Sequence, residues 1–201
     1  MAIVIVGGHA KNVGKSSVVS SLIARLPEGN WTAVKITQCG HGSSSANGEP
    51  HHCQTDDHPA AISVERDRTA GTDSARFLAA GARRSVWVRT HRGHLAEAMP
   101  CIRREIADAP NVIIESNSLL EFLRPDLYLV ILDYATNDFK DSARRFLGLA
   151  DAVLLRASPR ELTPRWEGVS PRLIAGKPQF LVMPPDLVAD DLVSFVKRKL
   201  D

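Results

Sequence analysis

Two glycines, a lysine and a serine near the N-terminus have the types and spacing that phosphate binding requires. Gly8 and Gly14 enclose five residues, and Lys15 and Ser16 follow directly. A glycine-rich turn points backbone N–H groups at an anion, and a lysine ammonium adds a point charge. A serine hydroxyl at the next position is a ligand for Mg²⁺. The segment therefore predicts a cradle for a Mg²⁺-bound polyphosphate.

The residues on either side supply the elements that such a cradle needs. Residues 3–6 are aliphatic, as in a strand buried within a parallel sheet, and residues 16–26 have the pattern of an amphipathic helix. A strand, a glycine-flanked turn and a helix are the context of the P-loop pattern. The commonest P-loop has its first glycine where this chain has His9. We expect Gly8 to supply a positive φ that His9 would adopt only at a cost.

Nucleotide binding is the first hypothesis for the chain. Lys15 is expected to contact the β- and γ-phosphates, and Ser16 Oγ to bind Mg²⁺. Lys35 is expected at the end of a second strand, on the same face as the P-loop, where it either contacts a phosphate or a substrate or is a plain surface lysine. Lys11 either contacts a phosphate, in the site of its own subunit or in that of a partner subunit, or is a solvated loop lysine. The predicted nucleotide-binding residues are Gly8, Asn12, Val13, Gly14, Lys15, Ser16, Ser17 and Lys35.

A carboxylate at the end of a neighbouring strand is expected to hold the metal, directly or through water. Glu115 follows the apolar residues 112–114 and is the first candidate. Asp133, after the apolar residues 127–132, is the alternative. Asn117 lies on the same loop as Glu115, where it is predicted to orient a water or a substrate. The predicted catalytic set is therefore Lys15, Glu115 and Lys11.

Predicted strands and helices alternate along most of the chain. Further strands are expected at 31–36, 60–64, 85–89, 152–155 and 180–183, and further helices at 75–80, 95–107, 139–149 and 191–200. This order predicts a single domain over residues 1–201, a three-layer α/β/α sandwich with a mostly parallel sheet. Ligands of such sheets bind at the carboxyl ends of the strands, where the candidate residues fall.

Composition restricts the function classes. The chain has 201 residues and a formal net charge of +2, which gives no bulk electrostatic attraction to nucleic acid or to a membrane. No apolar stretch approaches the roughly 18 residues of a membrane span. Three cysteines at wide spacing do not indicate a disulfide framework. A cytoplasmic protein is the expectation.

The segment 39–58 is rich in soft metal ligands, with four of the seven histidines and two of the three cysteines. Thiolate and imidazole ligands together suit Zn²⁺. One hypothesis is therefore a zinc site formed by Cys39, His41, His52 and Cys53. The alternative is a polar loop that closes over a substrate.

The loop resembles that of dethiobiotin synthetase, with five residues between the glycines and Val13 before the second. This places the chain near the P-loop class that also holds the ParA/MinD ATPases and metal-centre maturation GTPases. The ParA/MinD type has a signature lysine five residues before the P-loop lysine. That position is Ala10 here, so Lys11 lies one residue away.

Residues 2–118 are also similar to the molybdopterin-guanine dinucleotide biosynthesis adapter family. The shared features are the P-loop, a strand ending at Lys35, a long loop, the stretch Asp73-Ser74-x-Arg76-Phe77, and an acid at Glu115. The resemblance implies ATP or GTP, Mg²⁺, a homodimer, and an adapter role beside a partner enzyme in molybdopterin-type cofactor biosynthesis, with weak NTPase activity. A small-molecule kinase or ligase resembling dethiobiotin synthetase, acting on an acceptor molecule, is the alternative. A ParA-like switch is the third.

The identity of the base stays open between adenine and guanine. GTPases of the common type read guanine with an Asn-Lys-x-Asp motif after a late strand. Residues 156–159, which follow the predicted strand 152–155, read Arg-Ala-Ser-Pro and contain no carboxylate.

Overall fold

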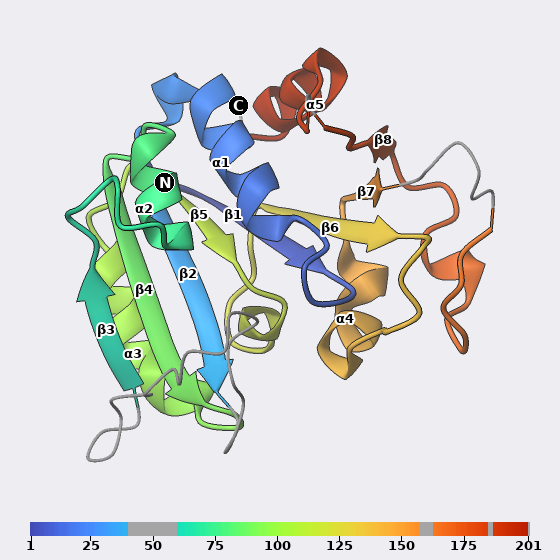
Figure 1. Ribbon diagram of the computed structural model, residues 1–201, viewed down its shortest axis with the longest axis horizontal. Helices are drawn as coiled ribbons and strands as arrows, with labels where there is room; N and C mark the ends of the chain where they lie inside the picture. The colour runs from blue at the N-terminus through green and yellow to red at the C-terminus, as the bar shows by residue number, and fades with distance from the viewer. Residues whose placement is uncertain (40–59, 157–162, 185–186, 201) are drawn as a thin grey trace.

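One eight-stranded sheet organises the residues that this computed structural model describes, 1–39, 60–156, 163–184 and 187–200 (Figure 1). Its strand order is β3-β4-β2-β5-β1-β6-β7-β8. Neighbouring strands are parallel, except that β3 runs antiparallel to β4. The strands are β1 (Ala2–Gly8), β2 (Trp31–Cys39), β3 (Ala60–Val64), β4 (Arg84–His91), β5 (Asn111–Glu115), β6 (Leu127–Asp133), β7 (Ala152–Arg156) and β8 (Gln179–Leu181).

Helices cover both faces of the sheet, which confirms the predicted three-layer α/β fold (Figure 1). On one face lie α1 (Lys15–Arg25), α2 (Asp73–Ala79) and α5 (Asp190–Leu200). On the other lie α3 (Leu95–Ile106) and α4 (Asp141–Phe146). The described helices include none that is long and apolar enough to cross a bilayer.

The central strand β1 shows why its sequence is apolar without alternation. Val4 and Val6 belong to the core beneath α1 and α5, whereas Ile5 belongs to the core beneath α3 and α4. A strand buried on both faces needs apolar residues at every position. Since β1 lies between β5 and β6, the turn that follows it opens at the carboxyl-end edge of the sheet, where α/β folds bind ligands.

Several predicted boundaries differ from the structure. Strands β2 and β4 extend to Cys39 and His91, which pair with each other beyond the apolar core. Backbone hydrogen bonding continues there, although the sequence has no apolar pattern that would predict it. The helix predicted at 139–149 begins at Asp141, because Lys140 is extended and its N–H donates to His9 O at 2.8 Å. Residues 147–149 form a separate 3₁₀ turn.

Candidate functional site

The turn between β1 and α1 has the backbone geometry of an anion cradle. Asn12 and Gly14 have φ angles of 58° and 93°, in the left-handed region. Such residues let successive N–H groups point into one concavity. Helix α1 begins at Lys15 directly after Gly14, which has no side chain to cap the first turn. The first amides of the helix are therefore available to an anion.

Gly8 is required for a different reason from the one expected. It does not have a positive φ, so that prediction is wrong. A Cβ atom at Gly8 would instead lie 2.6 Å from Val13 Cγ2 and 3.0 Å from Lys15 Cγ. Val13 is buried and holds the loop against the core, while the stem of Lys15 passes over Gly8. The glycine permits this close approach.

Glu115 is joined to the first turn of α1. Ser16 Oγ donates a hydrogen bond of 2.7 Å to Glu115 Oε2, and Lys15 Nζ lies 3.9 Å from Oε1. Glu115 is the last residue of β5 and pairs with Val6 of β1, so the sheet itself fixes its position. Its side chain is only 6% exposed. The structure thus brings together three of the predicted site residues.

Lys35 completes this group from β2. Its Nζ lies 3.1 and 3.0 Å from the two Glu115 carboxylate oxygens and 3.2 Å from Ser16 Oγ, and it forms an ion pair with Asp73. Asp73 is the first residue of α2. The N-cap of this helix is Thr72, whose hydroxyl accepts a hydrogen bond from the Ala75 N–H. The sequence analysis named Asp73 only within the stretch shared with the adapter family, not as a member of this cluster.

The charges in the cluster shift one another's proton affinity. Burial lowers the pKa of Lys15, against the attraction of Glu115. Burial also acts on Lys35, but the attraction of Glu115 and the hydrogen bond to Asp73 outweigh it, so the pKa of Lys35 is raised. The same contact lowers the pKa of Asp73. Burial of this half-buried carboxyl acts to raise its pKa, but the hydrogen bond and the charge attraction to Lys35 outweigh that effect.

The oxygen atoms around Lys35 suit a hard divalent cation. Ser16 offers a hydroxyl, and Glu115 and Asp73 offer carboxylates. These are the donors that Mg²⁺ takes in proteins. The Lys35 ammonium already lies among them, which shows that the site is built for positive charge. The residues present therefore fit the metal that the loop implies.

Lys140 is a neighbour of the loop that the sequence analysis did not single out. Its backbone N–H bonds to His9 O, which fixes it beside the turn. Burial, together with repulsion from Lys15 and Lys11, lowers the pKa of Lys140 to about 8. The signal available in the sequence was the position of Lys140, a lysine immediately before the helix that follows β6, at the edge of the sheet where ligands bind. Lys11 itself is exposed on the loop.

His9, which replaces the glycine of the commoner loop, is buried. Its ring centroid lies 5.1 Å from that of Phe139 and 5.2 Å from that of Trp166. The extra loop residue is therefore accommodated by packing under the turn. Burial lowers the pKa of His9, against backbone hydrogen bonds that act to raise it.

Two other predicted positions have different surroundings. Asp133 Oδ1 accepts from the Ala135 N–H at 2.9 Å and its Oδ2 lies 4.0 Å from Arg156 Nε, so Glu115 and not Asp133 contacts Ser16. Ser17 Oγ accepts from Arg76 Nη2 at 3.0 Å, which ties α1 to α2.

The predicted zinc site falls mostly outside the described residues. Cys39 ends β2 and is the one member of the predicted zinc set that lies within the described residues. His41, His52 and Cys53 lie outside the residues described. Within those that are described, no three histidine, cysteine or acidic side chains gather to hold a metal ion.

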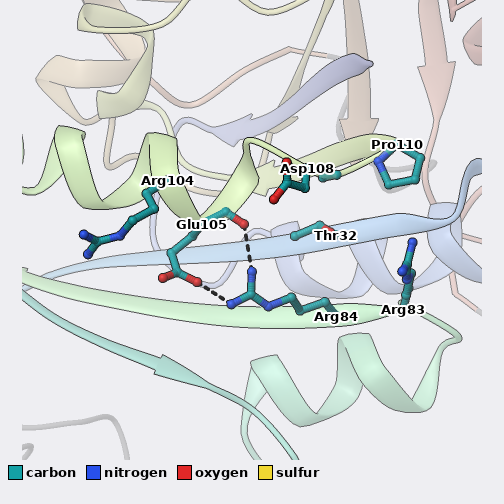
Figure 2. A pocket seen from close by; sticks show the side chains of 8 residues that line it. Thr32, Arg83, Arg84, Arg104, Glu105, Asp108 and Pro110 are labelled. Carbon is teal, nitrogen blue, oxygen red and sulfur yellow. Dashed lines mark hydrogen bonds and ion pairs between the residues drawn. The ribbon is translucent and has the colours of Figure 1, made fainter.

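A cavity of about 190 Å³ lies away from this cluster, among the first residues of β2 and β4 and the end of α3 (Figure 2). Arg84 donates to Glu105 O at 2.8 Å and also pairs with the Glu105 carboxylate. Its guanidinium is thus engaged in joining β4 to α3. Thr32 and Arg84 stand near the amino ends of their strands, opposite the edge that carries the loop.

Comparison with known proteins gives structural neighbours only. The sequence matches no protein-family model and no curated protein. Nickel-bound HypB from Helicobacter pylori is 15% identical, with a TM-score of 0.49 over 98% of this chain and 86% of that one. LpxK from Aquifex aeolicus in complex with ATP is 16% identical, with a TM-score of 0.47 over 90% of this chain and 53% of that one. MobB from Bacillus subtilis is 16% identical, with a TM-score of 0.43 over 100% of this chain and 99% of that one.

The class of the fold follows from the chain's own features. A parallel sheet with β1 at its centre, a left-handed turn after β1 and a helix that opens with Lys15 and Ser16 together form the α/β fold of the P-loop NTPase type. This confirms the fold class predicted from the sequence.

Proposed function

We propose that the chain binds a nucleoside triphosphate together with Mg²⁺ at the turn between β1 and α1. The observation that carries this proposal is the 2.7 Å hydrogen bond from Ser16 to Glu115. It joins the predicted metal-binding hydroxyl to the predicted acid, beside Lys15 and the free first amides of α1. A polyphosphate and its metal both find partners in this arrangement.

Each residue has a distinct role in the proposal. The amides at Gly14, Lys15 and Ser16 surround the β-phosphate, and the Lys15 ammonium contacts the β- and γ-phosphates. Ser16 and Glu115 hold Mg²⁺, which supplies charge neutralisation to the phosphates when it is bound. Lys35 lies within reach of the same phosphates, and Lys11 stands at the exposed rim of the loop.

Slow intrinsic hydrolysis is the expected activity. Both carboxylates next to Ser16, those of Glu115 and Asp73, are paired with Lys35. A carboxylate that pairs with an ammonium, or binds the metal, is a poor base for activating water. Among the described residues, none that contacts this group is a free general base. We expect a partner to be needed for faster turnover.

We further propose an adapter role in the biosynthesis of a molybdopterin-type cofactor, beside a partner enzyme. What supports it is the resemblance of residues 2–118 to that adapter family. Within that stretch, Asp73 belongs to the Asp-Ser-x-Arg-Phe segment and contacts Lys35 of the candidate site. The family's segment is thereby part of the proposed nucleotide site.

A thermal-shift experiment tests nucleotide binding and identifies the base. ATP, GTP, ADP and GDP are compared with and without Mg²⁺. A nucleotide at roughly a hundred times its Kd stabilises the protein by about 2.7 kcal/mol, which is readily measured. Lys15→Ala should keep the fold but weaken binding by about 10- to 100-fold, because a charge-assisted contact of about 1.5–3 kcal/mol is lost. Lys199→Ala, on the exposed side of α5, is the control. No shift with either triphosphate would exclude the proposal.

A further inference from the structure

The Lys35 ammonium occupies the centre of an oxygen cluster. It contacts Ser16 Oγ at 3.2 Å, both oxygens of Glu115 at 3.0–3.1 Å, and the Asp73 carboxylate. These oxygens come from α1, β5 and α2, and Lys35 comes from β2. Four separate elements therefore converge on one positive charge.

Strand register fixes the centre of this cluster. Lys35 and Glu115 are Cα partners in the parallel pair of β2 and β5. Partners in adjacent strands point to the same face of a sheet, so the two side chains meet. The side chains of Lys35 and Glu115 are well shielded, with exposed fractions of 18% and 6%, whereas Asp73 is half-buried, with an exposed fraction of 32%. Shielding from water strengthens each of these charge contacts.

The oxygens that hold Lys35 are those expected to hold the metal. Ser16 was assigned to Mg²⁺ from the loop pattern and Glu115 from its place at the end of a strand, and Asp73 adds a second carboxylate. An ammonium and a divalent cation cannot both lie within bonding distance of the same shielded oxygens, because like charges repel at that range. The two cations must therefore exclude each other.

We propose that Lys35 occupies the place of the divalent cation in the nucleotide-free protein and must leave for the metal to bind. The proposal rests on the proposed function, since it concerns the same site. The ammonium gives up carboxylate partners when it leaves, and the polyphosphate offers it new ones. Metal alone therefore binds weakly, whereas metal and polyphosphate bind together. Lys35 makes cation binding conditional on nucleotide.

Mn²⁺ alone, without nucleotide, is the probe for this exchange. Its binding is followed by the electron paramagnetic resonance signal of free Mn²⁺ and by calorimetry. Lys35→Met removes the competing charge with little change of length, so the variant should bind Mn²⁺ at least roughly tenfold more tightly than the wild type. Adding Glu115→Gln to that variant should abolish the gain. Lys199→Met removes the same charge at the surface and should leave Mn²⁺ binding unchanged.

A second variant and a second observable guard against misfolding. Lys35→Gln is measured in parallel, and circular dichroism establishes that each variant is folded. In the wild type, nitrogen-15 NMR of the lysine ammonium groups should show the Lys35 signal unchanged by Mg²⁺ alone and shifted by Mg²⁺ with triphosphate. A shift with Mg²⁺ alone, or unchanged Mn²⁺ affinity in the folded variants, would overturn the proposal.

The outcome separates this proposal from the proposed function. Tight Mn²⁺ binding by Lys35→Met without any nucleotide binding by the wild type supports the competition at Lys35 but excludes the nucleotide site. Nucleotide binding by the wild type without a gain in Lys35→Met supports the nucleotide site but excludes the competition.

Discussion

Asn117 and Gly8 hold each other through two reciprocal hydrogen bonds. Gly8 N donates to Asn117 Oδ1 at 2.9 Å, and Asn117 Nδ2 donates to Gly8 O at 2.8 Å. The amide side chain thereby bonds to the backbone of Gly8 as a neighbouring strand would, at the point where β1 ends and the loop begins. We predicted Asn117 to orient a water or a substrate, but in the structure its polar atoms contact the backbone of Gly8.

Replacing Asn117 should destabilise the protein and loosen the loop. In Asn117→Ala, the buried N–H and C=O of Gly8 lose their partners, at a cost of about 2–4 kcal/mol in the free energy of unfolding. Urea denaturation measures this loss. Asn137→Ala, at an exposed position before α4, should change stability by less than about 0.5 kcal/mol. Equal stability of the two variants would refute the assigned role of Asn117.

Gly8→Ala tests the close approach of the loop to β1. The new methyl group would lie 2.6 Å from Val13 Cγ2 and 3.0 Å from Lys15 Cγ, so one of these side chains must move. We expect a destabilisation of about 1–3 kcal/mol and weaker nucleotide binding. The matched control is Gly148→Ala, whose methyl group would meet only Leu173 Cδ2, at 3.6 Å. Thermal melts with and without triphosphate give both quantities, and a neutral Gly8→Ala would contradict the geometry.

Glu115→Gln should separate metal binding from nucleotide binding. The amide keeps the shape of the side chain but removes the charge that Mg²⁺ and Lys35 share. We expect the gain in nucleotide affinity on adding Mg²⁺ to fall by about tenfold or more, while metal-free affinity changes less. Calorimetry with and without Mg²⁺ measures the two affinities. If Mg²⁺ still enhances binding fully, another acid holds the metal, and Asp133→Asn becomes the variant to compare.

Nucleotide binding should take up protons near pH 8. The pKa of Lys140 is lowered to about 8 by burial and by repulsion from Lys15 and Lys11. A polyphosphate nearby favours the charged ammonium and so raises this pKa. At pH 8 about half of the free protein carries the proton and nearly all of the complex does, so uptake approaches about half a proton.

The direction in which nucleotide affinity changes with pH gives a second observable. Because the complex holds more protons than the free protein, affinity should decrease as the pH rises through 8 and level off below about 7. Calorimetry in buffers with different ionisation enthalpies measures the uptake. Lys140→Met should remove most of it. Uptake that is the same in this variant would assign the proton to another group.

The sequence was sufficient for the fold and for part of the site. The apolar strand 3–6, the amphipathic pattern after Gly14 and the alternation of elements predict a parallel sheet with a phosphate-binding turn, and the structure confirms that fold. Glu115 could be placed because strand ends share an edge in a parallel sheet. Its contact with Ser16 follows from that shared edge.

Other contacts depend on tertiary geometry that local patterns do not encode. Asp73 and Lys35 are 38 residues apart in the sequence, and the packing of α2 against α1, β2 and β4 brings them together. Lys140 approaches the turn through one backbone hydrogen bond to His9, which no periodicity announces. Gly8 was expected to be required for a positive φ angle. In the structure it is required because its lack of a side chain makes space for Val13 and Lys15.

Because Lys35 pairs with Glu115 across β2 and β5, the number of residues in β2 before Lys35 also matters for the site. Side chains alternate between the two faces of a strand, so deleting one residue between Trp31 and Lys35 would turn the ammonium toward α3. Such a deletion removes no atom of the site, yet it would leave the carboxylates facing an aliphatic neighbour. Within β2, the side chains that follow a change in length keep their faces only when residues are added or removed in pairs.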